Sequence, residues 1–290
     1  MDVHASVYKS EADRRRVHDL YRAELDAWPV AHDEIVVPTR MGDTFVVASG
    51  PEDGPAVLLL HGTMATAAMW REEMPVLAAG RRVFAVDVIG DAGFSAPARP
   101  ALTTDAHALW LLDVLAGLGG SHVHLVGLSF GGWVAIDFAS RCPDRVSSLT
   151  LITPGGVADR NVLVWALPLL VLGSWGAKKV MQRILGPAPA VRSEDQQRLG
   201  ALSAAIFEGM RPRTGGLRTF TDDVLARLQM PTLVLLGAED VTMDSGAIAQ
   251  RFRRLVPGAT VEVLAGKRHF LGDQSAAIDG FLRGARRAAS

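Results

Sequence analysis

Apolar and polar residues alternate along this chain in a way that predicts short buried strands separated by helices. Val57–Leu60 and Val123–Val126 are short apolar runs of strand length, typical of strands buried inside a sheet. Further strands are predicted at Val83–Val88, Val146–Thr153, Thr232–Leu236 and Thr260–Leu264, and helices at Trp70–Ala79, Asp105–Leu118, Gly246–Val256 and from about Gln274. Strand and helix alternating like this predicts a parallel sheet with helices on both faces.

The first part of the chain follows a different pattern. Ser10 opens an amphipathic segment with Asp13 three positions later, a loose capping box, so we expect a helical N-terminal extension over about residues 9–28. Two short extended stretches, Ile35–Val37 and Thr44–Ala48, follow it and flank a turn. They predict an antiparallel hairpin.

The alternation is lost from Pro154 to Pro231, where the sequence is mostly helical in pattern and rich in Leu, Val and Trp. This segment lies between two predicted strands of one sheet. We therefore expect an insertion above the strand ends, where such sheets bind ligands. The prediction is a helical lid at residues 154–230, which divides an α/β core into residues 1–153 and 231–290.

The most apolar part of this insertion is Val162–Leu172, which is apolar nearly all round and is expected to be covered on more than one side. One covered side would roof a pocket for medium-sized, apolar groups. The candidate pocket residues are Met64, Trp70, Trp165 and Leu169. The alternatives are that the segment completes the core, or forms a homodimer or membrane-surface contact.

Composition excludes several classes of protein. The 290 residues carry a net charge of −1, so no basic excess indicates a nucleic-acid partner. Cys142 is the single cysteine, which rules out an internal disulfide and suits a reducing compartment. The charged N-terminus lacks the apolar core of a signal peptide, so a cytoplasmic location is predicted. Pro168 breaks the apolar stretch at residues 161–180, which is too short for a transmembrane helix.

One short motif places a serine between two glycines, where a predicted strand gives way to a predicted helix. Gly127-Leu128-Ser129-Phe130-Gly131 matches the pattern G-x-S-x-G. In a strand–turn–helix context this pattern is the nucleophile elbow, and the glycines let the strand and helix backbones approach closely. Ser129 is therefore predicted to be a nucleophile.

A serine nucleophile needs a histidine base and a carboxylate that orients the histidine. Asp240 follows the predicted strand at Thr232–Leu236 and is the preferred acid, with Glu239 and Asp244 as alternatives. His269 follows the last predicted strand and is the predicted base. The order serine, acid, histidine is the one described for hydrolases with this elbow.

The reaction also needs two backbone N–H donors for the oxyanion. Phe130 directly follows the nucleophile and is predicted to supply one. The loop after Val57–Leu60 begins His61-Gly62-Thr63, and Thr63 is the best candidate for the other, with Met64 second. His61 is expected to order that loop. No group of residues has metal-ligand spacing, and neither a P-loop nor a dinucleotide fingerprint is present.

Together these motifs resemble the α/β-hydrolase superfamily, and within it bacterial serine carboxylesterases. The resemblance runs from about Ile35 to the C-terminus and rests on "LLLHGTMATAAMW", "VHLVGLSFGGWVAIDFASRCPDRVSSLTLITP" and "PTLVLLGAEDV". It departs at Asp91, where many relatives carry a Gly-x-Gly-x-Ser stretch, and at Lys267-Arg268, where relatives often have a small residue and glycine.

The resemblance implies a mostly parallel eight-stranded sheet and hydrolysis of a small to medium apolar ester through an acyl-enzyme, with no cofactor and no metal. Ser129 would attack, His269 would transfer the proton, and Asp240 would orient His269. The fold also hosts thioesterases and cofactor-free haloperoxidases, and the enzyme alternatives are C–C bond hydrolases, followed by lactonases. A slow-turnover ligand-binding or biosynthetic member is the alternative from another class.

Overall fold

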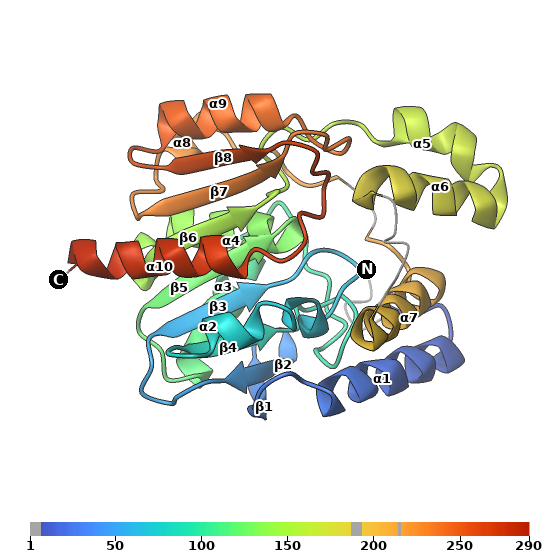
Figure 1. The fold of residues 1–290 in the computed structure, drawn as a ribbon, viewed down its shortest axis with the longest axis horizontal. Coiled ribbons are helices and arrows are strands. Elements are labelled where there is room, and N and C mark those ends of the chain that lie inside the picture. The colour runs from blue at the N-terminus through green and yellow to red at the C-terminus, as the bar shows by residue number, and fades with distance from the viewer. Residues whose placement is uncertain (1–6, 187–192, 214–215, 290) are drawn as a thin grey trace.

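The central feature of the molecule is one twisted sheet. The computed structural model describes residues 7–186, 193–213 and 216–289, and the sheet within them has eight strands in the order β1-β2-β4-β3-β5-β6-β7-β8 (Figure 1). They are β1 (His32–Thr39), β2 (Gly42–Ser49), β3 (Ala56–Leu60), β4 (Arg82–Val86), β5 (Val123–Leu128), β6 (Val146–Ile152), β7 (Thr232–Gly237) and β8 (Thr260–Leu264). β1 pairs with β2, and β2 with β4, in antiparallel fashion, and the other pairs are parallel. The predicted fold class is confirmed.

Helices cover both faces of this sheet, because alternate side chains of the buried strands point to opposite faces. Leu58 and Leu60 of β3 pack with one set of helices, whereas Val57 and Leu59 pack with the other. The first set is α3 (Ala106–Gly117), α4 (Phe130–Arg141), α8 (Asp222–Leu225) and α9 (Ser245–Leu255). The second set is α1 (Glu11–Asp26), α2 (Met74–Leu77) and α10 (Ser275–Ala289). A short 3₁₀ helix, η2 (Pro143–Arg145), links α4 to β6.

The helix expected near Trp70–Ala79 is shorter in the structure. The chain instead forms a 3₁₀ helix, η1 (Ala67–Trp70), and then the four-residue helix α2. Pro75 is consistent with a helix that begins here, because proline lacks an N–H and is tolerated in the first turn of a helix but not in its interior.

The insertion between β6 and β7 begins with the helices α5 (Leu163–Leu170), α6 (Gly173–Leu185) and α7 (Glu194–Gly209), and α8 follows before β7. α7 packs along α1 (Figure 1), and its Leu202 and Ile206 share a buried cluster with Val17 and Tyr21 of α1. Beyond α7 the chain forms an isolated β-bridge between Met210 and Tyr8. The N-terminal extension therefore holds one helix of the insertion against the core.

The other two insertion helices, α5 and α6, pack against each other and stand away from the sheet (Figure 1). Ala166 and Val180 are buried, but Leu167, Val171 and Leu172 are 59%, 78% and 57% exposed. The expectation that Val162–Leu172 is covered on more than one side is therefore wrong at this end. The reason is geometric, since a projecting pair of helices buries only the faces that meet each other or the core.

None of the helices within the described residues combines the length and the apolar character needed to cross a membrane.

Candidate active site

Ser129 lies at the sharp turn between β5 and α4, and its backbone adopts a conformation that side-chain-bearing residues rarely take. Its φ is 53° and its ψ is −109°. The turn requires its glycines: a Cβ on Gly127 would lie 2.4 Å from the carbonyl oxygen of Gly131, and a Cβ on Gly131 would lie 2.1 Å from that of Leu60. A non-glycine residue held at positive φ stores about 1–3 kcal/mol of strain, and such strain is concentrated at functional sites.

Three side chains from different loops form one hydrogen-bonded chain. His269, in the loop after β8, places Nε2 2.9 Å from Oγ of Ser129 and Nδ1 2.8 Å from Oδ2 of Asp240. Asp240 follows β7 directly. Because Nδ1 faces a carboxylate, it carries the proton, which leaves Nε2 free to accept the hydroxyl proton of Ser129. The structure therefore brings together the three residues predicted as nucleophile, base and acid.

The alternative acids lie elsewhere. Asp244 caps α9 by accepting the N–H of Ala247 at 3.0 Å, and it also accepts a hydrogen bond from Arg160. Glu239 is an exposed carboxylate 3.9 Å from Arg268. The carboxylate that contacts the ring of His269 is that of Asp240.

The carboxylate of Asp240 is held by a residue that the sequence interpretation missed. Oδ1 of Asp240 accepts both the backbone N–H and the hydroxyl of Thr242, each at 2.7 Å. Burial alone would raise the pKa of Asp240, but its bond to His269 and the hydroxyl of Thr242 outweigh burial and lower it. Asp240 is therefore ionised and fixed in direction. The available signal was the spacing Asp-x-Thr, in which a threonine can bond back to the preceding aspartate.

The loop after β3 lies beside Ser129, since a Cβ on Gly62 would be 3.4 Å from that of Ser129. His61 is fully buried and orders this loop: its Nε2 accepts the N–H of Val88 at 2.9 Å and its Nδ1 bonds to the carbonyl of Gly62 at 2.8 Å. Burial lowers the pKa of His61 to about 4, so the ring is neutral at physiological pH.

The predicted oxyanion donors are the backbone N–H groups of Thr63 and Phe130, with that of Met64 as an alternative. The structure rules out the N–H of Met64, because it already has a hydrogen-bond partner. Met64 has a φ of 57°, and its N–H is donated to Oδ1 of Asp91 at 2.7 Å. The N–H of Met64 is therefore not available to a substrate oxyanion. Phe130 is the first residue of α4, where N–H groups have no partner within the helix and the helix dipole favours negative charge.

The four candidate pocket residues have different surroundings. Met64 and Leu169 are half-buried, whereas Trp70 is 1% exposed within the core cluster that also contains Leu59. The side chain of Trp165 lies outside the described residues. The assignment of these residues to a substrate pocket stays a prediction.

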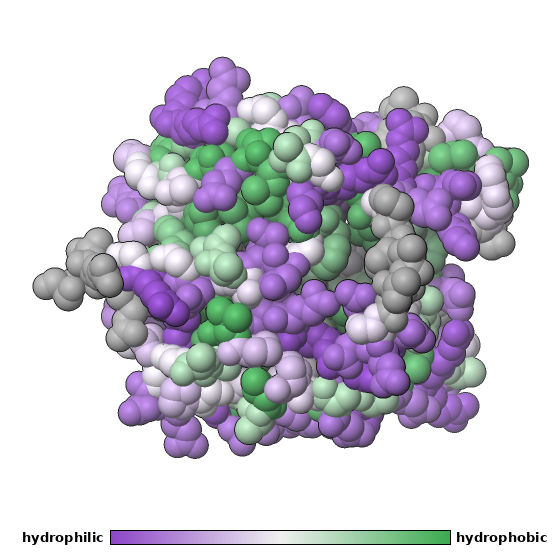
Figure 2. Space-filling model, viewed as in Figure 1, coloured by the Kyte–Doolittle hydropathy of each residue, from purple (hydrophilic) through white to green (hydrophobic). Residues whose placement is uncertain are grey.

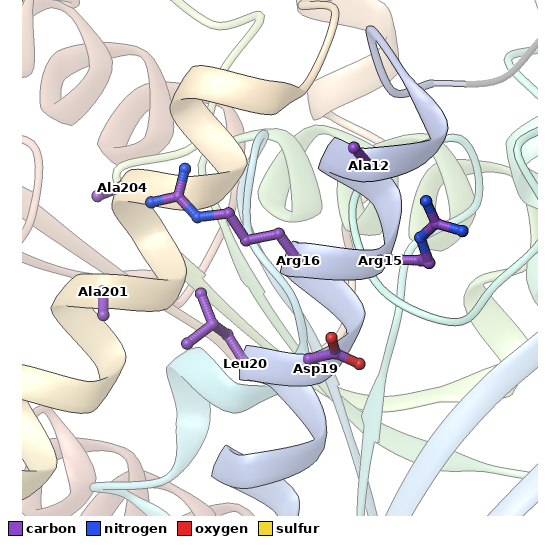
Figure 3. A pocket seen from close by; sticks show the side chains of 7 residues that line it. All are labelled: Ala12, Arg15, Arg16, Asp19, Leu20, Ala201 and Ala204. Atoms are coloured by element: carbon purple, nitrogen blue, oxygen red, sulfur yellow. The ribbon is translucent and has the colours of Figure 1, made fainter.

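Two hollows on the surface lie away from the hydrogen-bonded chain. A groove of about 640 Å³ runs between α1 and α7, with Arg15, Arg16 and Leu20 on one side and Ala201 and Ala204 on the other (Figure 3). A second, of about 550 Å³, is lined by residues of the N-terminal extension and of the loop after β4, among them Tyr8, Arg14, His18 and Asp91. Ser129 and His269 line neither of these hollows.

Within the described residues, no group of three or more His, Cys, Asp or Glu side chains is placed to hold a metal ion.

Comparisons with known proteins identify the family of this chain. Residues 57–281 match the family model described as the alpha/beta hydrolase family. Carboxylesterase YbfK of Bacillus subtilis is 30% identical over 260 residues, which cover 88% of each chain. The crystal structure of naproxen esterase (carboxylesterase NP) from Bacillus subtilis superposes with a TM-score of 0.82 at 29% identity, covering 95% of this chain and 99% of that one. A shorter match, 36% identical over 108 residues, is to 2-hydroxymuconate semialdehyde hydrolase of a Pseudomonas species, and it covers 36% of this chain and 38% of that one. The chain belongs to the alpha/beta hydrolase family.

Proposed function

We propose that this protein is a serine carboxylesterase that works through an acyl-enzyme. The observation that carries the proposal is the continuous chain of hydrogen bonds from Asp240 through His269 to Ser129, with Ser129 on a strained turn. The similarity to YbfK and to naproxen esterase, both named as carboxylesterases, supports the same reaction.

Each residue of the chain has one role in this mechanism. Oγ of Ser129 attacks the ester carbonyl while Nε2 of His269 takes its proton. Asp240 holds the ring with Nε2 toward Ser129 and stabilises the charged imidazolium that forms. The N–H groups of Thr63 and Phe130 stabilise the oxyanion, which is usually the largest single contribution to such a reaction. His269 then protonates the leaving alcohol, and water repeats the sequence on the acyl-enzyme.

The proposed substrate is a small to medium ester with apolar groups. Residues 154–230 would act as a lid, with α5 and α6 above the strand ends that carry Ser129 and Asp240. Leu169 is a half-buried residue of α5, and we assign it to the pocket roof. Apolar walls favour apolar acyl or alcohol groups because burying them removes hydrocarbon from water.

The test of the reaction is Ser129→Ala, assayed with short p-nitrophenyl esters. Turnover is expected to fall by about 10⁴- to 10⁶-fold, because the remaining groups cannot form the acyl-enzyme. An organophosphonate should add one adduct that mass spectrometry maps to Ser129. Ser203→Ala, which changes an exposed serine on α7, is the matched control and should keep the parent's rate. Retention of more than about a tenth of the activity in Ser129→Ala would contradict the proposal.

The match to 2-hydroxymuconate semialdehyde hydrolase makes C–C bond hydrolysis the second candidate function. The two reactions are separated by assaying the purified protein on a dienoate semialdehyde in parallel with p-nitrophenyl esters. A kcat/KM that is higher for the semialdehyde than for every ester would favour C–C hydrolysis.

A further inference from the structure

Asp91 connects the loop after β4 to the loop that carries Thr63. Its side chain is fully buried, and its Oδ1 accepts the N–H of Met64 at 2.7 Å. Met64 is one of three residues other than glycine with positive φ within the described part of the chain. The N–H of Met64 belongs to the Thr63–Met64 peptide group, so the hydrogen bond that it donates to the buried carboxylate fixes that peptide plane. The N–H of Thr63 lies in the preceding peptide group, which joins this fixed plane at the Cα of Thr63, so the hydrogen bond limits the directions that this N–H can take.

Arg213, from the insertion, reaches the same place. Its Nε lies 4.0 Å from Oδ2 of Asp91, and its NH2 group donates to the carbonyl of Ile89 at 2.7 Å. The guanidinium also lies over the ring of Phe130, 4.5 Å from the ring centre. One arginine therefore touches both the loop partner of Met64 and the residue whose N–H is the other proposed oxyanion donor.

The segment that carries Arg213 is tied to the core. Arg99 donates to the carbonyl of Gly90 at 2.6 Å and to that of Arg211 at 2.7 Å. This arrangement keeps Arg213 beside Asp91. Burial raises the pKa of Asp91 to about 6, and Arg213 opposes this rise. At pH 7.5 the carboxylate is therefore mostly ionised and accepts the N–H of Met64 as a charged group.

We propose that Asp91 is a positioning residue for the oxyanion hole, and that Arg213 aligns its two halves by contacting both Asp91 and Phe130. This inference rests on the proposed function, because it assigns Thr63 and Phe130 as the donors. The side chain of Asp91 is 0% exposed and that of Arg213 is 10% exposed, so we assign their effect to the tetrahedral intermediate and not to binding of the ester.

The variants are Asp91→Ala, which removes the acceptor, and Asp91→Asn, which keeps an oxygen for Met64. Arg213→Met and Arg213→Lys make the same comparison for the arginine. Asp137→Ala is the matched control, because Asp137 is a 1%-exposed aspartate on α4 that also pairs with an arginine of the insertion, Arg218, at 3.3 Å. Its side chain makes no hydrogen bond to the loop after β3 within the described structure.

Two readouts separate positioning from a purely structural role. The first is the split between kcat and KM for a p-nitrophenyl ester. The second is the affinity for an alkylboronic acid, which forms a tetrahedral adduct on serine, measured by calorimetry so that the stoichiometry reports the folded fraction. A loss of folded protein lowers the stoichiometry and leaves the dissociation constant unchanged.

For Asp91→Ala we expect kcat and boronic-acid affinity to fall together by about 10- to 100-fold, with KM within about threefold of the parent. The reason is that a displaced N–H donor loses part of the stabilisation of the oxyanion that is lost when the donor is removed. Asp91→Asn should recover most of the loss, and Asp137→Ala should keep the parent's dissociation constant. An unchanged boronic-acid affinity in Asp91→Ala would overturn the inference. Should Ser129→Ala remain active as well, the proposed function itself would have failed.

Large apolar side chains are exposed at the outer end of α5 and α6. Leu167, Val171, Leu172 and Trp175 are each more than half exposed there. Figure 2 shows hydrophobic side chains at this end of the molecule. Large apolar side chains gathered at one exposed tip indicate an interaction surface.

The charge at this tip has one sign. Residues 163–185, which span α5 and α6, contain three cationic side chains and no Asp or Glu, in a protein whose net charge is −1. Lys178 and Lys179 are exposed on α6, and Nζ of Lys179 lies 5.7 Å from the ring centre of Trp175. Exposed aliphatic residues, a tryptophan and adjacent lysines are the features of an element that lies in the interface of an anionic membrane.

We infer that the tip formed by Leu167, Val171, Leu172, Trp175, Lys178 and Lys179 docks on an anionic lipid surface. The apolar side chains enter the acyl boundary while the lysine ammonium groups contact lipid phosphates. This contact requires no change in the hydrogen-bonded chain at Ser129 and is measured without substrate.

The experiment is co-sedimentation with vesicles of phosphatidylcholine, alone or mixed with phosphatidylglycerol. We expect binding to the mixed vesicles that weakens as salt is raised. The double substitution Lys178→Ala with Lys179→Ala should weaken it by roughly 30-fold, from about 1 kcal/mol for each lysine. Val171→Asp with Leu172→Asp should abolish it, whereas Val36→Asp, at a 59%-exposed valine on β1, should not. Equal binding to both vesicle types, or a dimer in solution that Val171→Asp with Leu172→Asp dissociates, would overturn the inference.

Discussion

Thr242 donates two hydrogen bonds to one oxygen of Asp240, from its backbone N–H and from its hydroxyl, and so leaves the other oxygen to His269. The hydroxyl also lies 2.9 Å from Nδ1 of His269. A threonine two residues after the acid therefore fixes the direction of the whole chain of hydrogen bonds, although it does not take part in proton transfer.

Thr242→Val tests this role. The substitution keeps the shape of the side chain and removes the hydroxyl, so Asp240 loses one charged hydrogen bond. We expect kcat to fall by about tenfold with KM little changed, from roughly 1.5 kcal/mol for such a bond. Steady-state kinetics on a p-nitrophenyl ester measure both constants. Thr242→Ser restores the hydroxyl and should stay close to the parent, and equal losses in the two variants would contradict the argument.

Ser129→Gly should inactivate the protein and stabilise it. Glycine adopts the φ of 53° found at Ser129 without the steric cost that a Cβ brings. We expect the free energy of unfolding to rise by about 1 kcal/mol in Ser129→Gly, measured by urea denaturation. Ser129→Ala keeps the Cβ and is the control, with a stability near the parent's. A glycine variant less stable than the alanine variant would show that the turn is unstrained.

Glu73 should make stability depend on pH. Burial is the first cause that raises its pKa to about 7, and the nearby Asp273 adds to the rise. The folded state binds the proton of Glu73 more tightly than the unfolded state does, so protonated Glu73 stabilises the folded state. This stabilisation is complete below 4.5, the ordinary pKa that the side chain has in the unfolded chain. It is lost as pH rises through about 7. We expect the Glu73 contribution to fall by about 3 kcal/mol between pH 4.5 and pH 8.5.

Glu73→Gln is the variant that measures this contribution, since the amide has nearly the same shape and does not ionise. Urea denaturation at pH 5 and pH 8.5 should show a gain over the parent at the higher pH and little gain at the lower one. Asp113→Asn alters a more exposed carboxylate that pairs with Arg40, and it should not give a gain at high pH. The same difference from the parent at both pH values for Glu73→Gln would rule out a titration of this group.

Substrate preference tests the proposed roof of the pocket. If Leu169 contacts the acyl chain, kcat/KM should rise about fourfold for each added methylene until the pocket is full. A series of p-nitrophenyl esters of increasing acyl length measures the slope, and Leu169→Ala should flatten it. Leu167→Ala, at a 59%-exposed leucine of the same helix, is the matched control. A slope that is the same in all three proteins would remove Leu169 from the pocket.

The sequence was sufficient for the sheet and for the pairing of Ser129 with His269, whereas it left Glu239 and Asp244 as alternatives to Asp240 until the structure placed Asp240 against His269. Apolar runs such as Val57–Leu60 could only be buried strands, and the glycines around Ser129 left one backbone geometry for the turn. The order of Ser129, Asp240 and His269, each after a separate strand, followed from the motif. These features are local or depend on the order of elements, which is why the chain itself determined them.

Tertiary structure decided what depends on contacts between distant segments. Asp91 departs from the pattern of related chains, and only the fold shows that it holds Met64 and faces Arg213, 122 residues later. The exposed ends of α5 and α6 could not be predicted either, because an apolar helix has the same sequence pattern whether other segments cover it or it projects from the core. Periodicity reports which face of an element is apolar, whereas burial depends on which other segments the chain brings against that face.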